Sequence, residues 1–290
     1  WDLFLECTEN QKNRYGAWIE TDEWTIASIS PELFFSRTGS SLYCRPMKGT
    51  SARGRWYQED QKLYEQLKRS DKNRAENLMI LDMVRNDLGK IARVGTVQVQ
   101  ELFHIEAYPT VWQMISGVSA ESDADLGTLM KALYPAASIT GTPKKAALEA
   151  IRHLECSPRR IYTGSIGFMQ PNQDMQWNVA IRTILKNNRT NEVEYGTGGG
   201  IVWDSTQKDE YQETLDKTKI LIENRPGFRI LETIAWSSHY GWLLLDAHLK
   251  RMKESAFCLH FPFPESEIRN RLNLALRDNS DEASRIRLLL

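Results

Sequence analysis

The amino-acid sequence predicts an α+β protein, because strand-like and helix-like segments occupy separate stretches of the chain. The run from Tyr15 to Phe35 alternates and is rich in β-branched and aromatic residues, which predicts two paired strands that turn near residues 21–23. From Tyr57 to Leu88 the apolar residues instead recur at helical spacing. Further strand-like runs come later, over 161–170, 175–185 and 193–202.

The other elements follow from local signals. Gly89 is suited to end a helix that spans Lys72 to Leu88, and Pro143 is suited to the first turn of a helix over 144–154. The remaining predicted elements are a strand over 94–105, helices over 126–134, 207–223 and 248–257, and a hairpin formed by 228–236 and 242–245.

Composition excludes several classes of protein. With 290 residues, 41% of them hydrophobic, the chain is long enough for one large or two ordinary globular domains. A formal net charge of -1 offers no broad basic surface for nucleic acid or an anionic membrane, and no apolar run approaches the roughly 20 residues of a membrane-spanning helix. The four cysteines lack C-x-x-C spacing, which argues against a zinc cluster or disulfide framework and favours a cytoplasmic setting.

A lysine and a glutamate stand at neighbouring turns of the strand-like region. Lys48 lies in the sequence Arg-Pro-Met-Lys-Gly-Thr, and Glu32 lies sixteen residues upstream in Ser-Pro-Glu. The strand and turn between them can bring both side chains to one edge of a sheet. A partly desolvated lysine can attack carbon, and the glutamate can protonate a leaving group. The alternative is a solvated turn lysine and an ordinary strand-entry glutamate.

Three glutamates have a pattern that suits a metal ion. Glu210 and Glu213 lie one turn apart on a predicted helix, and Glu76 lies on another. Carboxylates without histidine or cysteine are typical ligands of a hard cation such as Mg²⁺. The same glutamates can equally be solvated or paired with Lys217 or Arg74.

Three other features suit an anionic ligand. The run Gly196-Thr197-Gly198-Gly199-Gly200 allows close approach of backbone N–H groups, although a tight turn explains it equally well. Ser138 opens a hydroxyl-rich segment that leads into a helix N-terminus. Arg182, in an apolar strand-like run, can grip a carboxylate with two hydrogen bonds or extend its charged end into solvent.

Together these segments resemble the chorismate-utilising enzymes, and most closely the family of component I of aminodeoxychorismate synthase. The resemblance covers residues 1 to about 223, without the N-terminal portion of the family. It rests on eight motifs in the same order, at 30–32, 45–50, 74–88, 138–144, 162–167, 179–183, 198–205 and 210–214. It implies a chorismate-binding fold of two packed, mainly antiparallel sheets flanked by helices.

The resemblance also implies roles for individual residues. Glu76 and Glu213 would bind Mg²⁺ directly and Glu210 through water, so that the ion bridges to the ring carboxylate of chorismate. The residues implied to hold the enolpyruvyl carboxylate or to lie near it are Tyr162, Arg182, Gly198, Gly200 and Ser138.

Lys48 distinguishes two reactions within the resembled family. The anthranilate synthases usually have alanine at this position, whereas in aminodeoxychorismate synthases the lysine is thought to attack C2 while Glu32 helps to expel the C4 hydroxyl. Ammonia would then enter at C4. Two positions depart from the family pattern: Gln113 stands where many relatives have histidine, and Asn73 where an acid often stands.

A second resemblance begins near residue 228. The sequences at 228–233, 245–252 and 255–257 resemble the start of aminodeoxychorismate lyase, a fold-type IV pyridoxal-phosphate enzyme. That family commonly contacts the cofactor phosphate with the arginine of His-x-x-Arg, here Arg251. Its Schiff-base lysine would lie beyond residue 290, so pyridoxal phosphate is expected for the complete lyase domain only.

These inferences predict a synthase domain over 1–223, a linker over 224–227 and an incomplete lyase-like domain over 228–290, with both ends truncated. The expected activity is ammonia-dependent amination of chorismate toward p-aminobenzoate and folate, with ammonia from a glutamine amidotransferase. The alternatives are anthranilate synthase component I and an inactive fragment that serves only as a binding partner.

Overall fold

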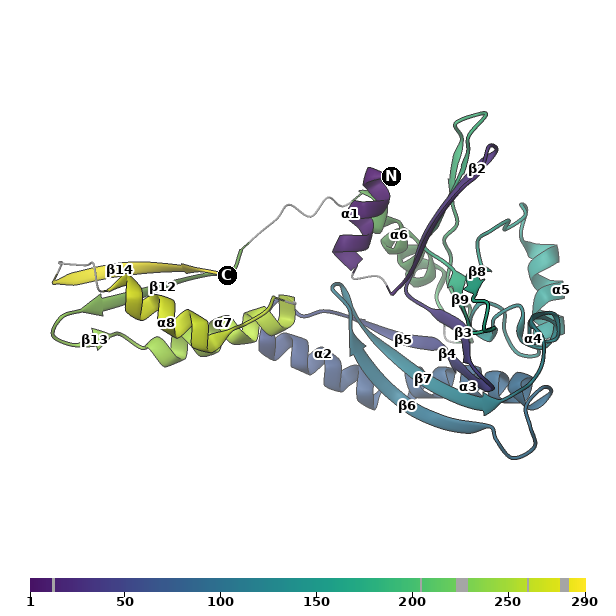
Figure 1. Cartoon of the computed structure of the whole chain (residues 1–290), viewed down its shortest axis with the longest axis horizontal. Helices are drawn as coiled ribbons and strands as arrows, with labels where there is room; N and C mark the ends of the chain where they lie inside the picture. Colours follow the sequence, from purple (N-terminus) through teal and green to yellow (C-terminus); the bar gives the residue numbers. More distant parts are fainter. Residues whose placement is uncertain (12–13, 204, 223–228, 260, 277–281) are drawn as a thin grey trace. The chain divides into compact units, whose positions relative to one another are not determined.

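A computed structural model describes residues 1–11, 14–203, 205–222, 229–259, 261–276 and 282–290 (Figure 1). The chain divides into two compact units. Unit 1 contains Trp1–Ser51 and Gln66–Asn224, and unit 2 contains Ala52–Glu65 and Arg225–Leu290. The predicted linker over 224–227 lies outside the described residues, as does Asp204 of the motif at 198–205.

Unit 1 contains two antiparallel sheets. One has the order β1-β2-β10-β11 and the other the order β5-β7-β4-β3-β9-β8, with β6 paired to β7. The strands are β1 (Tyr15–Glu20), β2 (Trp24–Ser30), β3 (Leu33–Thr38), β4 (Ser41–Arg45), β5 (Met47–Ala52), β6 (Gln98–Ala107), β7 (Val111–Glu121), β8 (Gly164–Met169), β9 (Met175–Ala180), β10 (Thr183–Asn187) and β11 (Val193–Tyr195). The predicted fold class is confirmed.

Helices accompany these sheets within unit 1, and α3 lies along β7 (Figure 1). They are α1 (Asp2–Gln11), α3 (Asp71–Gly89), α4 (Leu126–Leu133), the short 3₁₀ helix η1 (Ala137–Ile139), α5 (Lys144–Leu154) and α6 (Gln207–Ile222). The core between α3, α4 and the larger sheet is built from fully or nearly fully buried side chains, among them Phe35, Leu42, Leu81, Leu88, Val118 and Leu129. Removal of this apolar surface from water stabilises the arrangement.

Three predicted elements differ most from the structure. The strand predicted over 175–185 is divided into β9 and β10, which belong to different sheets. Arg182, between them, has a φ of 49°, a left-handed conformation that extended strands do not allow. The helical region predicted from Tyr57 to Leu88 contains α2 (Tyr57–Arg69) and α3, because the Ser70 hydroxyl accepts a hydrogen bond from Asn73 N and caps α3. The strand predicted over 193–202 ends at Tyr195.

Unit 2 contains the first part of α2 and the elements that follow residue 229. They are β12 (Leu231–Ser237), β13 (Gly241–Trp242), α7 (Leu245–Leu259), α8 (Glu265–Ala275) and β14 (Ala283–Leu289). The hairpin of β12 and β13 is confirmed, and β14 pairs with the other edge of β12. Ile234, Leu249, Ile268 and Leu272 form a small core. No helix in the described ranges is long and apolar enough to cross a membrane.

Candidate active site

Strand pairing brings Glu32 to the segment that carries Lys48. Glu32 lies between β2 and β3, and the register of β3 with β4 places Leu33 opposite Arg45. The start of β3 therefore lies beside the end of β4, from which Pro46 leads directly into β5 and Lys48. The predicted closeness of Glu32 and Lys48 is supported, because the Lys48 charge acts on the Glu32 carboxyl. Lys48 itself lies within β5 and not on a turn as predicted, because the chain resumes strand pairing directly after Pro46.

Glu32 is a buried carboxyl group that forms none of the ion pairs found among the described residues. It is only 5% exposed. Burial raises its pKa from 4.5 to about 7, and the Ser138 hydroxyl, the Met47 backbone N–H and the Lys48 charge offset this only in part. A carboxyl group with this pKa retains a proton at near-neutral pH, which is the requirement for a general acid.

Lys48 extends from β5 toward α3 and the glycine run. Its Nζ lies 3.6 Å from Oε2 of Glu76, and about a quarter of its side chain is exposed. A Cβ atom on Gly200 would lie 2.8 Å from Nζ, so this position accepts only glycine without displacement of the lysine. Gly200 thus belongs to the immediate surroundings of Lys48.

The glycine run also adjoins Tyr162 and the glutamates of α6. A Cβ atom on Gly198 would lie 3.1 Å from the Tyr162 hydroxyl, and one on Gly199 would lie 2.8 Å from Oε2 of Glu210. The backbone of the run is therefore close to both an aromatic hydroxyl and a carboxylate. It has no regular secondary structure, consistent with the predicted close approach of backbone to other groups.

The three candidate metal ligands are divided between two places. Oε1 of Glu210 accepts a 2.5 Å hydrogen bond from the Ser205 hydroxyl, whereas Oε2 is buried without a hydrogen-bond partner. Glu213 pairs with Lys217 at 2.7 Å, as one alternative reading of the sequence expected, and Glu76 pairs with Lys48. The described residues include no group of three acidic, histidine or cysteine side chains placed to hold one ion.

These donors nevertheless fit a hard cation in their chemistry. All three are carboxylates, and the unpartnered Oε2 of Glu210 is an orphaned buried acceptor beside Gly199. In this structure the ammonium groups of Lys48 and Lys217 supply the positive charge beside Glu76 and Glu213, respectively. A metal ion bound by all three carboxylates requires these lysine contacts to rearrange.

Arg182 and two tyrosines surround a second polar region. Burial lowers the pKa of the Arg182 guanidinium, although the residue as a whole is partly exposed, and Tyr195 and Tyr108 counteract the shift. Burial raises the pKa of Tyr195 to about 12, and Tyr162 is also near it. The sequence analysis missed Tyr195 and Tyr108, because a tyrosine at a strand end carries no signal of a long-range contact.

Ser138 and Gln113 have different environments. The Ser138 hydroxyl is buried and faces Glu32, but no partner meets hydrogen-bond geometry with it. It lines a pocket that also includes Glu32 and Asp87. The Gln113 amide is engaged with β5, because Nε2 donates to Gly49 O at 2.9 Å and Oε1 accepts from the Thr50 hydroxyl at 3.0 Å.

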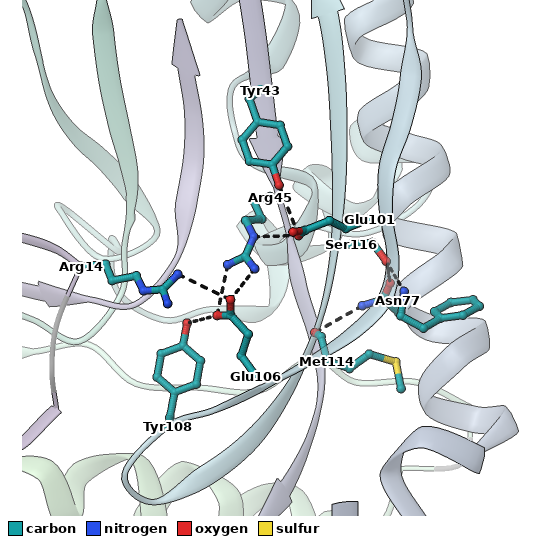
Figure 2. Close-up of polar contacts among 10 residues, drawn as sticks. Arg14, Tyr43, Arg45, Asn77, Glu101, Glu106, Tyr108, Met114 and Ser116 are labelled. Carbon is teal, nitrogen blue, oxygen red and sulfur yellow. Dashed lines mark hydrogen bonds and ion pairs between the residues drawn. The ribbon is translucent and has the colours of Figure 1, made fainter. Parts of the chain in front are cut away.

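A charged network that the sequence analysis did not anticipate lies at the end of β4 (Figure 2). Arg45 donates to Glu106 through Nη2 at 2.6 Å and to Glu101 through Nε at 3.0 Å. Tyr43, Tyr108 and Arg14 contact the same carboxylates. Only 10% of the Arg45 side chain is exposed, so this is a largely buried ion-pair network.

In unit 2, Arg251 is bound to a buried carboxylate. It donates to Glu232 through Nε at 2.6 Å and through Nη2 at 2.5 Å, and His248 Nδ1 lies 2.8 Å from the same group. Hydrogen bonds from Arg251 lower the pKa of Glu232. Since 67% of the Arg251 side chain is exposed, its outer face is still accessible to solvent.

The fold of unit 1 thus brings Lys48 and the acidic helix α6 to the glycine run, with the buried acid Glu32 near Lys48, an arrangement expected of a chorismate-binding enzyme. The chain belongs to that family: the family described as chorismate binding enzyme matches residues 1–223, which confirms the membership predicted from the motifs. The family described as amino-transferase class IV matches residues 229–290.

Individual relatives agree with this assignment. The chain is 39% identical over 225 residues to aminodeoxychorismate synthase component 1 of Escherichia coli K12, and the match covers 77% of this chain and 49% of the relative. It is 38% identical over 219 residues to the Bacillus subtilis protein of the same name, with 75% and 46% covered. The chain therefore spans about half the length of these curated relatives.

A solved structure shows the same fold. Anthranilate synthase component I from Streptococcus pneumoniae TIGR4 superposes with a TM-score of 0.69 at 29% identity, over 77% of this chain and 49% of that chain.

Proposed function

We propose that residues 1–223 convert chorismate and ammonia to 4-amino-4-deoxychorismate. The observation that carries the proposal is that the buried acid Glu32, just before β3, lies near enough to Lys48 of β5 for the lysine charge to act on its pKa. The relatives named aminodeoxychorismate synthase component 1 support it. The product leads toward p-aminobenzoate and folate.

In the proposed mechanism the amine of Lys48 attacks C2 of chorismate. The ring double bonds shift, the C4–O bond breaks, and Glu32 donates its proton so that water leaves. Ammonia then bonds to C4, the double bonds shift back and the Lys48 amine departs from C2, so the enolpyruvyl ether is retained. Lys48 enters this step as the neutral amine, after it has released its proton to solvent.

The same proposal assigns the substrate carboxylates to two places. Arg182 and Tyr162 would hold the enolpyruvyl carboxylate, with Gly198, Gly200 and Ser138 nearby. Gln113 acts through β5, which it ties to β7. Mg²⁺ held by Glu76 and Glu213, with Glu210 in support through water, would neutralise the ring carboxylate.

We also propose a partner and a second activity for the longer protein. A glutamine amidotransferase subunit would supply ammonia, since the relatives carry the designation component 1. Residues 228–290 would form the start of an aminodeoxychorismate lyase in which the exposed face of Arg251 contacts the phosphate of pyridoxal phosphate. A cytoplasmic location stays a prediction from the cysteine pattern.

Product identification tests the proposed function. The chain is incubated with chorismate, ammonium and Mg²⁺, and products are identified by mass spectrometry. We expect the C4-aminated product, its loss in Lys48→Ala and in excess chelator, and full activity in Lys219→Ala, whose side chain forms a surface pair with Asp216. A C2-aminated product would favour the anthranilate synthase alternative, and chorismate binding without turnover would favour the binding-partner alternative.

A further inference from the structure

We propose that Asn77 is a positioning residue that holds Lys48 in its reactive place, an inference that rests on the proposed function of Lys48. A lysine side chain is long and has many rotamers, so a nucleophilic lysine needs a firmly held backbone and a partner for its amine. Helix α3 supplies both from consecutive residues. Glu76 faces Nζ of Lys48, and the Nδ2 group of Asn77 donates to Lys48 O at 2.9 Å.

The Asn77 amide is itself held on its other side. Asn77 is 2% exposed, and its Oδ1 accepts a 2.5 Å hydrogen bond from the Ser116 hydroxyl of β7. Nδ2 also lies 3.4 Å from Met114 O (Figure 2). The amide orientation follows from this network, because only Nδ2 can donate to two carbonyl oxygens.

Ser116 connects this amide to the turn before Lys48. Its backbone N–H donates to Pro46 O at 3.2 Å, and its hydroxyl accepts from Phe103 N at 3.1 Å. A chain of hydrogen bonds therefore runs from Phe103 of β6 through Ser116 and Asn77 to the backbone carbonyl of Lys48. Rotation of β5 away from α3 would have two effects at once. It would break the hydrogen bond from Asn77 to Lys48 O, and it would move Nζ of Lys48 away from Glu76.

A purely structural role for Asn77, as a tie between α3 and β7, predicts a different outcome from a positioning role. A tie affects stability alone, whereas a positioning residue changes the environment and reactivity of Lys48. The two are separated by chemical labelling of Lys48, which does not depend on any assumed reaction, and by the split between kcat and KM.

The experiment uses the 290-residue chain with Asn77→Asp, which retains the acceptor for Ser116 but loses both donors, and the milder Ser116→Ala. Asn178→Asp is the matched control, because Asn178 is 3% exposed in the same unit and also donates to a backbone carbonyl, Tyr15 O, at 2.9 Å. Lysines are acetylated in a short pulse and quantified by peptide mass spectrometry, with exposed Lys90 and Lys219 as internal references.

We expect the labelling rate of Lys48 to rise at least threefold in Asn77→Asp and by less in Ser116→Ala, and to stay unchanged in Asn178→Asp. We also expect kcat for C4 amination to fall at least tenfold in Asn77→Asp, with the KM for chorismate changed less than threefold. Parent-like Lys48 labelling in both variants overturns the proposal, even if they unfold more readily. Absence of C4 amination by the parent would refute the proposed function instead. The labelling rates of Lys48 would still test whether Asn77 positions it.

Discussion

Two glutamates in unit 1, the buried Glu32 and the partly buried Glu106, have opposite electrostatic environments. Glu32 has no ion-pair partner among the described residues, and burial raises its pKa to about 7. Burial also acts against the charged form of Glu106, but hydrogen bonds and charge from Arg45, with Arg14 and His104, lower its pKa below the ordinary value. Lys48 and Arg45, only three residues apart in sequence, thus act on two very different acids: the Lys48 charge offsets the raised pKa of Glu32 only in part, whereas Arg45 keeps Glu106 ionised.

The difference shows that one fold can hold one carboxyl group ionised in an ion pair and keep another one protonated. Glu106 meets the planar guanidinium of Arg45 with two hydrogen bonds, so its charge is matched and it stays ionised. Glu32 lacks such a partner, so it keeps a proton that it can donate. A compensated carboxylate stabilises the protein, whereas an uncompensated one is available for reaction.

The largest expected effect concerns the reactivity of the unpaired acid. Glu32→Gln should lower kcat for C4 amination about 10²–10⁴-fold, the usual contribution of a general acid. The kcat of the parent should decline above about pH 7, as Glu32 loses its proton. Steady-state kinetics from pH 5.5 to 8.5 measure both. A variant within tenfold of the parent would remove Glu32 from the acid role.

The paired acids should instead govern stability. Arg45→Met leaves Glu106 and Glu101 without their buried cation, and we expect the free energy of unfolding in urea to fall by about 3–5 kcal/mol at pH 7. Arg271→Met removes an exposed pair with Glu267 and should change it by about 1 kcal/mol or less. Equal losses in the two variants would show that the Arg45 network contributes no more than a surface pair.

The pH dependence of stability should also differ. The pKa of Glu32 is higher in the folded protein than in the unfolded chain, so its stabilising contribution is present below about pH 4.5 and is lost as the pH rises through about 7. Its shift corresponds to about 3 kcal/mol. Glu32→Gln should therefore gain stability relative to the parent by that amount between pH 4.5 and 8.

For Glu106 the sign is reversed, because its pKa is lowered: its contribution is present above its ordinary pKa and is lost as the pH falls through the folded value. Urea unfolding at several pH values measures how the free energy of unfolding changes with pH for each variant. The control Glu121→Gln changes an exposed carboxylate, 51% accessible, and should leave the parent slope between pH 4.5 and 8 intact. If the free energy of unfolding changed with pH in the same way in Glu32→Gln and in the parent, the buried, unpaired state of Glu32 would be contradicted.

The smallest effect concerns a buried cation. Arg182→Lys keeps the charge but loses the planar donors, and it should weaken chorismate binding by about 1–3 kcal/mol. Calorimetric titration with chorismate measures this, with Arg189→Lys, an exposed residue in the turn after β10, as a control. Unchanged affinity in Arg182→Lys would place the substrate carboxylate elsewhere.

The sequence by itself predicted the candidate pair Lys48 and Glu32 and the order of most elements. The two residues were predicted to come together because the strand and turn between them can bring both side chains to one edge of a sheet. The α+β class and the hairpin of unit 2 followed from residue periodicity, which depends on neighbours along the chain. The family followed from motifs that are likewise local.

Only the tertiary structure decided which charges are matched. The raised pKa of Glu32 depends on its burial, and the pairings of Glu76 with Lys48 and of Arg45 with Glu106 join residues far apart in sequence. The bend at Arg182 also divides one apolar run between two sheets. Periodicity cannot predict such features, because strand register and side-chain burial are set by packing between distant segments.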